Sequence, residues 1–97
     1  MKKVAVISNR LRDRDLESTK KIVDILKNAG AEIYVNAKDI SGSIYFESVE
    51  DIVKRADIAV VLGGDGTIIS AGKICAKYDV PVLGINLGRL GFLVELE

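Results

Sequence analysis

Residues 58–77, with the sequence IAVVLGGDGTIISAGKICAK, contain the transition that decides the fold. Ile58–Leu62 is an uninterrupted apolar run, which is typical of a strand covered on both faces. Beyond the glycine-rich turn, apolar and small side chains recur at positions i, i+3, i+4 and i+7, the spacing of a helix that packs against a sheet. These positions are Ile68, Ala71, Gly72 and Cys75. The stretch therefore predicts a buried strand, a tight turn and a helix.

Segments of the same kind lie on both sides of this unit. We expect strands at Val4–Ile7, Glu32–Asn36 and Val82–Ile85. Polar and small residues at 38–43 predict a loop, and Ser48 with Asp51 is a capping pair for a short helix that follows. Strands that alternate with helices indicate βαβ units and a parallel sheet with right-handed crossovers.

The helix expected after the first strand is placed by its apolar spacing. Its inward face is predicted from residues at i, i+3, i+4 and i+7, with Asp15 as its N-cap and Gly30 at its C-terminal end. The four residues of that face are Ile22, Ile25, Leu26 and Ala29.

Composition excludes several classes of protein. The 97 residues have a formal net charge of zero, 48% hydrophobic residues, one cysteine and no histidine. A single cysteine cannot form an intramolecular disulfide, and a chain without histidine lacks the usual nitrogen ligand of zinc. No apolar run approaches the roughly 20 residues that cross a bilayer. A neutral chain also lacks the positive footprint of nucleic-acid binding. We expect a single cytoplasmic domain with no nucleic-acid or membrane partner.

Ligands of parallel α/β domains gather at the carboxyl ends of the strands, which here are followed by Asn9–Arg14, Gly63–Thr67 and Asn86–Gly91. The turn Gly63–Thr67 opens a helix, so its amides and the helix dipole favour a phosphate. Asp65 would repel a phosphate unless it binds a metal ion or accepts a proton. The alternative is structural: the glycines turn the chain and Asp65 caps the helix. The turn fits neither the Walker loop nor the dinucleotide fingerprint.

Two motifs carry a resemblance to a known family. Gly63-Gly64-Asp65-Gly66-Thr67 resembles the signature of a superfamily that holds NAD kinases, diacylglycerol and sphingosine kinases and 6-phosphofructokinases. The segment Gly84–Leu93, GINLGRLGFL, resembles the loop after the fourth strand in NAD kinases. The resemblance extends from the first strand to Leu93 and implies a three-layer, Rossmann-like α/β domain with a mostly parallel sheet.

NAD kinases transfer the γ-phosphoryl group of ATP, or of polyphosphate in some members, to the 2′-hydroxyl of the adenosine ribose of NAD. The resemblance implies that Asp65 accepts the hydroxyl proton, that Gly66 lies against NAD, and that Gly63, Gly64 and Thr67 face the phosphates. It also implies a divalent metal ion, Mg²⁺ by preference, although no metal ligand is assigned within the chain.

The second motif supplies further candidates. Leu90, Gly91 and Phe92 match the family segment that lines the adenosine pocket, and core packing is the alternative for Phe92. Arg89 and Arg10 are candidates for phosphate contacts, with solvated loop positions as the alternative for both. Asn9 is a further candidate because it ends the first strand at the same edge. On its helix face, Cys75 is expected to be an inert core thiol.

The resemblance also has consequences for domain organisation. It identifies residues 1–97 as an N-terminal kinase domain without the β domain that follows it in the family, so this chain alone is expected to be inactive or nearly so. Family members are homo-oligomers. Two alternatives stay open: a lipid or sugar kinase of the same superfamily, and a non-catalytic nucleotide-binding α/β module.

Overall fold

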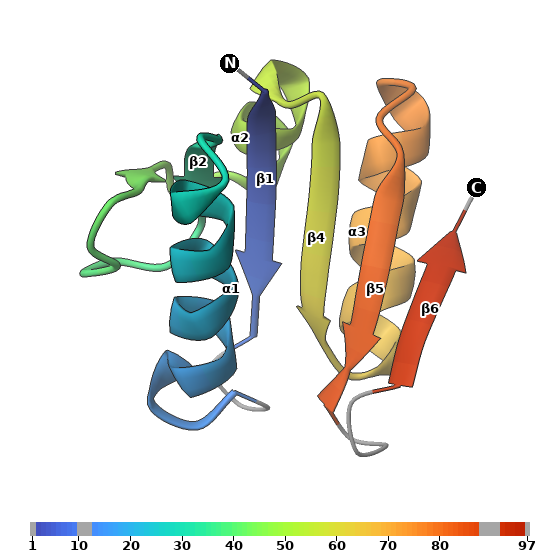
Figure 1. The fold of residues 1–97 in the computed structure, drawn as a ribbon. Coiled ribbons are helices and arrows are strands. Elements are labelled where there is room, and N and C mark those ends of the chain that lie inside the picture. The colour runs from blue at the N-terminus through green and yellow to red at the C-terminus, as the bar shows by residue number, and fades with distance from the viewer. Residues whose placement is uncertain (1, 10–12, 88–91, 97) are drawn as a thin grey trace.

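A computed structural model describes residues 2–9, 13–87 and 92–96, and they form one mixed sheet with helices on both faces (Figure 1). The sheet has six strands in the order β3-β2-β1-β4-β5-β6. Its strands are β1 (Lys3–Ser8), β2 (Glu32–Val35), β3 (Ile44–Tyr45), β4 (Ile58–Gly63), β5 (Val82–Asn86) and β6 (Phe92–Leu96). The helices are α1 (Glu17–Asn28), α2 (Val49–Arg55) and α3 (Asp65–Lys77), with a 3-10 turn, η1 (Arg14–Leu16), before α1.

Two apolar clusters, one on each face of the sheet, make the domain three layers thick. Successive strand residues point to opposite faces, so Val4 and Val6 join the cluster that contains Val23 of α1. Ala5 and Ile7 join the cluster beneath α2 and α3. Figure 1 shows α1 in front of the sheet and the other two helices behind it. The predicted three-layer, Rossmann-like α/β architecture with a mostly parallel sheet is confirmed.

The parallel part of the sheet comprises β1 to β5, and β6 runs antiparallel to β5. The four strands expected from the sequence are present. β3 and β6 were not expected: β3 is only a two-residue strand, and the sequence pattern ended with the strand before β6. The predicted capping pair is confirmed, since the amide of Asp51 donates to the Ser48 hydroxyl at 3.3 Å.

The predicted inward face of α1 was wrong by part of a turn. Thr19 and Val23 are fully buried, whereas Ile25 is 63% exposed and Ala29 is also exposed. Ile22 and Leu26 lie at the border of the buried stripe. A pattern of apolar residues alone misses this stripe because Thr19 is polar. Thr19 can be buried because its hydroxyl donates a hydrogen bond to a buried side chain.

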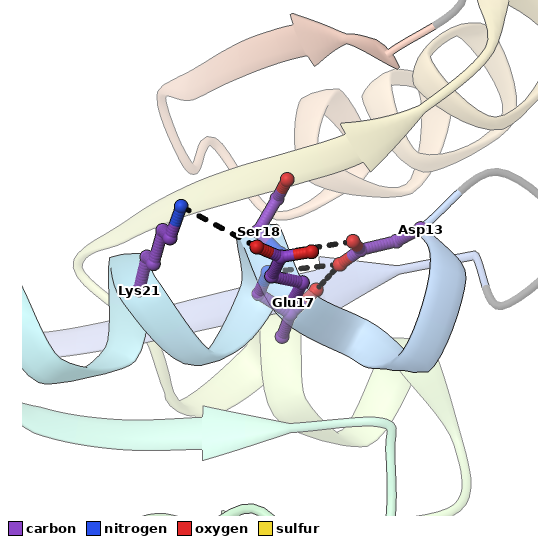
Figure 2. A network of polar contacts seen from close by, with 5 residues as sticks. Asp13, Glu17, Ser18 and Lys21 are labelled. Atoms are coloured by element: carbon purple, nitrogen blue, oxygen red, sulfur yellow. Dashed lines mark hydrogen bonds and ion pairs between the residues drawn. The ribbon is translucent and has the colours of Figure 1, made fainter.

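That partner is Asp13, which also corrects the predicted cap: Leu16 occupies the N-cap position without a side-chain bond, and the Asp13 side chain supplies the acceptor instead. Asp13 is 3% exposed, and its carboxylate accepts hydrogen bonds from the backbone amides of Ser18 and Thr19 at 3.0 and 2.8 Å and from the Thr19 hydroxyl (Figure 2). Asp15 was the wrong choice because it and Leu16 have left-handed backbone angles, φ 54° and 56°, that fold the chain back before α1. Asp13 thereby reaches the amides that open the helix.

Candidate active site

The candidate site lies at the edge of the sheet where β1, β4 and β5 end. Because these strands are parallel and paired, with Ser8 opposite Leu62 and Gly63 opposite Asn86, their carboxyl ends meet side by side. The turn that joins β4 to α3 begins at this edge, and β4 lies between β1 and β5. The expectation that these segments of the chain share one edge is confirmed for the residues that the structure describes.

The room around two glycines of this turn, and not their backbone angles, shows what a larger side chain would do there. Within the described residues, left-handed glycines occur at Gly30 and Gly42 and not in this turn. A Cβ atom on Gly63 would lie 2.8 Å from Cβ and 3.0 Å from Cγ2 of Thr67, so a larger residue collides with the first turn of α3. A Cβ atom on Gly66 would meet nothing within 4 Å. Gly63 is therefore required by packing, and Gly66 leaves open space at the surface.

Asp65 is the first residue of α3, and its exposed carboxylate sits where the helix dipole favours negative charge. The structural alternative, that Asp65 is the N-cap of the helix, was wrong: Gly64 occupies the N-cap position and Asp65 is the first residue of the helix. Asp65 instead accepts a hydrogen bond at Oδ1 from the side-chain amide of Asn86, which is 4% exposed. A carboxylate at the surface is thus tied to a buried group of the neighbouring strand.

On the other side of the turn, Thr67 is joined to the end of β1. The side-chain amide of Asn9 donates to the Thr67 hydroxyl oxygen at 2.8 Å, and the backbone amide of Asn9 donates to the Leu62 carbonyl at 3.2 Å. The carbonyl of Asn9 in turn accepts the amide of Asp13, the residue that caps α1. Asn9 therefore connects the glycine-rich turn to the start of the first helix.

A cleft of about 620 Å³ opens beside Gly66 and Thr67, between the ends of β1 and β2 and the flank of α3. Its polar lining consists of uncharged side chains, and the rest is apolar. The polar residues are Ser8, Asn9, Asn36, Thr67 and Ser70, and the apolar side chains are Ile7, Val49, Ala71 and Ile74. Such a lining suits a neutral, partly apolar ligand group with several hydrogen-bonding atoms.

Sequence reasoning missed Asn36 and Asn86 as individual site residues. The Asn36 carboxamide oxygen accepts the Ser8 amide at 2.9 Å, and its nitrogen donates to the Ser8 carbonyl at 3.2 Å, so it fixes the end of β1 from the neighbouring strand. Both asparagines lie where a strand ends at the ligand edge, Asn86 as the last residue of β5 and Asn36 just after β2. Their position was the signal that could have identified them, because ligands of parallel α/β domains bind where the strands end, and a polar side chain there is a candidate for the site.

Several predicted site residues cannot be placed. Arg10, Arg89, Leu90 and Gly91 lie outside the described residues, and of Phe92 only the backbone is described, paired with Asn86 in the antiparallel ladder. Among the described residues, Gly63, Gly64, Asp65, Gly66, Thr67 and Asn9 come together at one edge.

Two further observations limit the chemistry available to the described residues. Residues 2–9, 13–87 and 92–96 contain no group of three acidic, cysteine or histidine side chains that could hold a metal ion by themselves. Cys75 is fully buried, and burial raises the pKa of its thiol, which makes it a poor nucleophile and fits the predicted inert core position. In the same part of the chain, no helix is long and apolar enough to cross a membrane.

Comparisons with known proteins agree on one family. The profile of the family described as ATP-NAD kinase N-terminal domain matches residues 47–97. Over 100 aligned residues, the chain is 42% identical to the NAD kinase of Caldanaerobacter subterraneus subsp. tengcongensis, an alignment that covers 100% of this chain and 35% of that protein. It is 42% identical over 98 residues to the NAD kinase of Lachnoclostridium phytofermentans, covering 100% of this chain and 34% of that protein.

The NAD kinase of Geotalea daltonii is 41% identical over 99 residues, which cover 99% of this chain and 34% of that protein. The chain thus spans about a third of the length of these curated relatives. With the family profile matching more than half of the residues, the chain belongs to the family of ATP-NAD kinase N-terminal domains.

Proposed function

We propose that the protein phosphorylates the 2′-hydroxyl of the adenosine ribose of NAD with the γ-phosphoryl group of ATP and forms NADP. Family membership supports this reaction, as do the relatives named NAD kinase. The structural observation that carries the proposal is the placement of Asp65. Its carboxylate lies at the surface, is tied to Asn86, and stands next to Gly66, whose missing side chain leaves room for a ligand.

In the proposed reaction Asp65 accepts the proton of the 2′-hydroxyl. The hydroxyl oxygen forms a bond to the γ-phosphorus, the bond from that phosphorus to the β–γ bridging oxygen breaks, and ADP leaves with the electron pair. A carboxylate that lies within reach of a substrate hydroxyl can accept its proton by general base catalysis. Because positioning and charge neutralisation provide most of the rate enhancement in phosphoryl transfer, orienting the hydroxyl is as important a task for Asp65 as removing its proton.

The start of α3 is suited to the phosphate groups. The amides at the N-terminus of this helix lack intrahelical partners, and the helix dipole favours negative charge there. Asp65 adds a negative charge at the same place, which is unfavourable for a phosphate unless a cation is present. This arrangement supports Mg²⁺ as a cofactor, and when bound that ion neutralises charge on the transferred phosphoryl group.

The described oxygen atoms fit such an ion in kind. Mg²⁺ is usually carried by substrate phosphates and water with one or two protein oxygens, so a cage of several carboxylates is not required. Among the described residues of the turn, the Thr67 hydroxyl is a hard oxygen that would join the substrate phosphates and water around such an ion, while the Asp65 carboxylate would receive the substrate proton. The neutral cleft beside them suits the uncharged nucleoside part of one of the two nucleotides, with its phosphates directed to the start of α3.

An assay of NADP formation with ATP, NAD and Mg²⁺ tests the proposal. We would run it on the longest form of the protein that the gene encodes and on the 97-residue chain in parallel, with polyphosphate replacing ATP in a second series. Activity of the longer form alone would support a site completed by other parts of the protein, as expected if it is, like its relatives, about three times as long as this chain. Phosphorylation of a lipid or a sugar with NAD inert would refute the proposed acceptor.

The Asp65→Asn variant tests the assigned proton acceptor. The amide keeps an oxygen that can accept from Asn86 but loses the charge that the helix start favours, so stability should fall by no more than about 1 kcal/mol. The rate of NADP formation should fall by about 10²-fold or more, within the range attributed to general base catalysis. A variant that retains the full rate would show that another group accepts the proton. We also propose a cytoplasmic, homo-oligomeric enzyme; sedimentation of the active form tests the oligomeric state, and cell fractionation tests the location.

A further inference from the structure

We propose that Asn86 is a positioning residue for Asp65: its buried side-chain amide holds the carboxylate in the orientation that receives the substrate proton. This inference depends on the proposed function, since it takes Asp65 as the proton acceptor. Asn86 itself is not expected to touch the substrate. It would act on the reaction through the carboxylate that it holds.

The backbone of Asn86 is fixed from both sides. It is the last residue of β5, where it lies opposite Gly63 of β4 in the parallel ladder and opposite Phe92 of β6 in the antiparallel ladder. Its side chain is 4% exposed, one of three buried polar or charged side chains among the described residues, with Asp13 and Thr19. Asp13 and Thr19 bond to each other at the start of α1, whereas Asn86 is directed to the glycine-rich turn.

In the hydrogen bond between these two side chains, Asn86 is the donor and Asp65 is the acceptor. A carboxylate only accepts hydrogen bonds, so the carboxamide nitrogen of Asn86 must face Oδ1 of Asp65. A surface aspartate without such a contact exchanges between rotamers, and a bond from a buried amide on a fixed backbone selects one of them. Because a carboxylate can accept several hydrogen bonds, this contact is compatible with a second bond from a substrate hydroxyl.

The neutrality of Asn86 is part of the inference. A lysine or arginine at position 86 would compensate the charge of Asp65 and make that carboxylate a weaker proton acceptor. An aspartate at position 86 would repel the Asp65 carboxylate. A carboxamide orients the carboxylate while adding no net charge near the phosphates. The alternative is that Asn86 has only a structural role and that its contact with Asp65 has no effect on the reaction.

Kinetics of Asn86→Leu in the longest form of the protein separate these two roles. Leucine has nearly the same shape but cannot donate a hydrogen bond. If Asn86 positions Asp65, kcat should fall by about 10- to 100-fold, the scale of a misplaced reacting group, while KM for NAD and for ATP changes by less than about twofold. An unchanged kcat would overturn the inference.

A double-mutant cycle provides the decisive comparison. In the Asp65→Asn background the carboxylate is already absent, so adding Asn86→Leu should cost no further activity. If the losses of the two single variants instead multiply in the double variant, Asn86 acts independently of Asp65 and the inference is wrong.

A matched control comes from the opposite end of the same strand. Val82 is 5% exposed, and Val82→Ala should lower stability without changing kcat, because this residue is remote from Asp65 along β5. Should Asn86→Leu fail to fold, Asn86→Ser keeps a small polar group but is too short to reach the carboxylate, and the same loss of kcat is expected. If the unaltered protein forms no NADP, the proposed function fails; if it is active and both Asn86 variants match it, only the present inference fails.

Discussion

Two alanine substitutions three residues apart in the glycine-rich turn should differ in their effect on stability: Gly63→Ala should lower it, and Gly66→Ala should leave it unchanged or raise it. In Gly63→Ala the new Cβ would lie 2.8 Å from Cβ, 3.0 Å from Cγ2 and 3.1 Å from Oγ1 of Thr67. The Thr67 side chain cannot easily rotate away, because a β-branched residue in a helix has restricted χ1 and its hydroxyl accepts a hydrogen bond from Asn9. Either the helix start shifts or that bond is lost.

The expected size follows from these contacts. Overpacking of this kind costs about 1–3 kcal/mol, and losing the bond from Asn9 would cost about 0.5–1.5 kcal/mol. The reduced entropy of the unfolded chain offsets about 0.4–1 kcal/mol. Gly63→Ala should therefore destabilise the domain by about 1–2 kcal/mol, which lowers Tm by roughly 4–8 °C per kcal/mol for a domain of this size.

Gly66→Ala is the matched control. Its Cβ meets nothing within 4 Å, and alanine is favoured over glycine in a helix by up to about 1 kcal/mol, so stability should be unchanged or higher. The added methyl group would occupy space at the cleft, and we expect NADP formation to fall. Urea unfolding followed by circular dichroism measures both stabilities. A Gly63→Ala domain as stable as the parent would refute the packing reasoning, and a fully active Gly66→Ala enzyme would refute the assignment of ligand space.

Four other substitutions and one labelling experiment test the fold. Asp13→Ala removes the acceptor for the amides that open α1 and should cost about 1–2 kcal/mol in urea unfolding, whereas Asp13→Asn should recover part of that loss. Ile25→Gln should change stability by less than about 0.5 kcal/mol because Ile25 is 63% exposed, whereas Val23→Ala should cost about 2 kcal/mol; equal effects would contradict the observed face of α1. Since burial raises the pKa of Cys75, an aromatic disulfide reagent at pH 8 should label its thiol only as fast as the domain unfolds.

The order of the strands and helices could be predicted from the sequence because hydrophobic periodicity is a local property. The runs at Val4–Ile7 and Ile58–Leu62 are apolar at consecutive positions, which is typical of strands covered on both faces, and the structure buries them between two layers of helix. The position of the site was predictable for the same reason, since parallel strands place their carboxyl ends at one edge. The short edge strand β3 could not be predicted in this way because two residues are too few to show an alternation of apolar and polar side chains.

The tertiary structure decided how the polar side chains pair. The sequence identifies Asp65 as a carboxylate in a glycine-rich turn at the ligand edge, but its bond to Asn86 joins residues 21 positions apart, and Asn9 and Thr67 are 58 apart. Asp13 displaces Asp15 as the cap of α1 because two left-handed residues reverse the chain, a conformation that composition does not encode. Hydrophobic burial follows from the spacing of neighbours along the chain, whereas a directional hydrogen bond needs both partners brought within about 3 Å, and only the folded sheet supplies that distance.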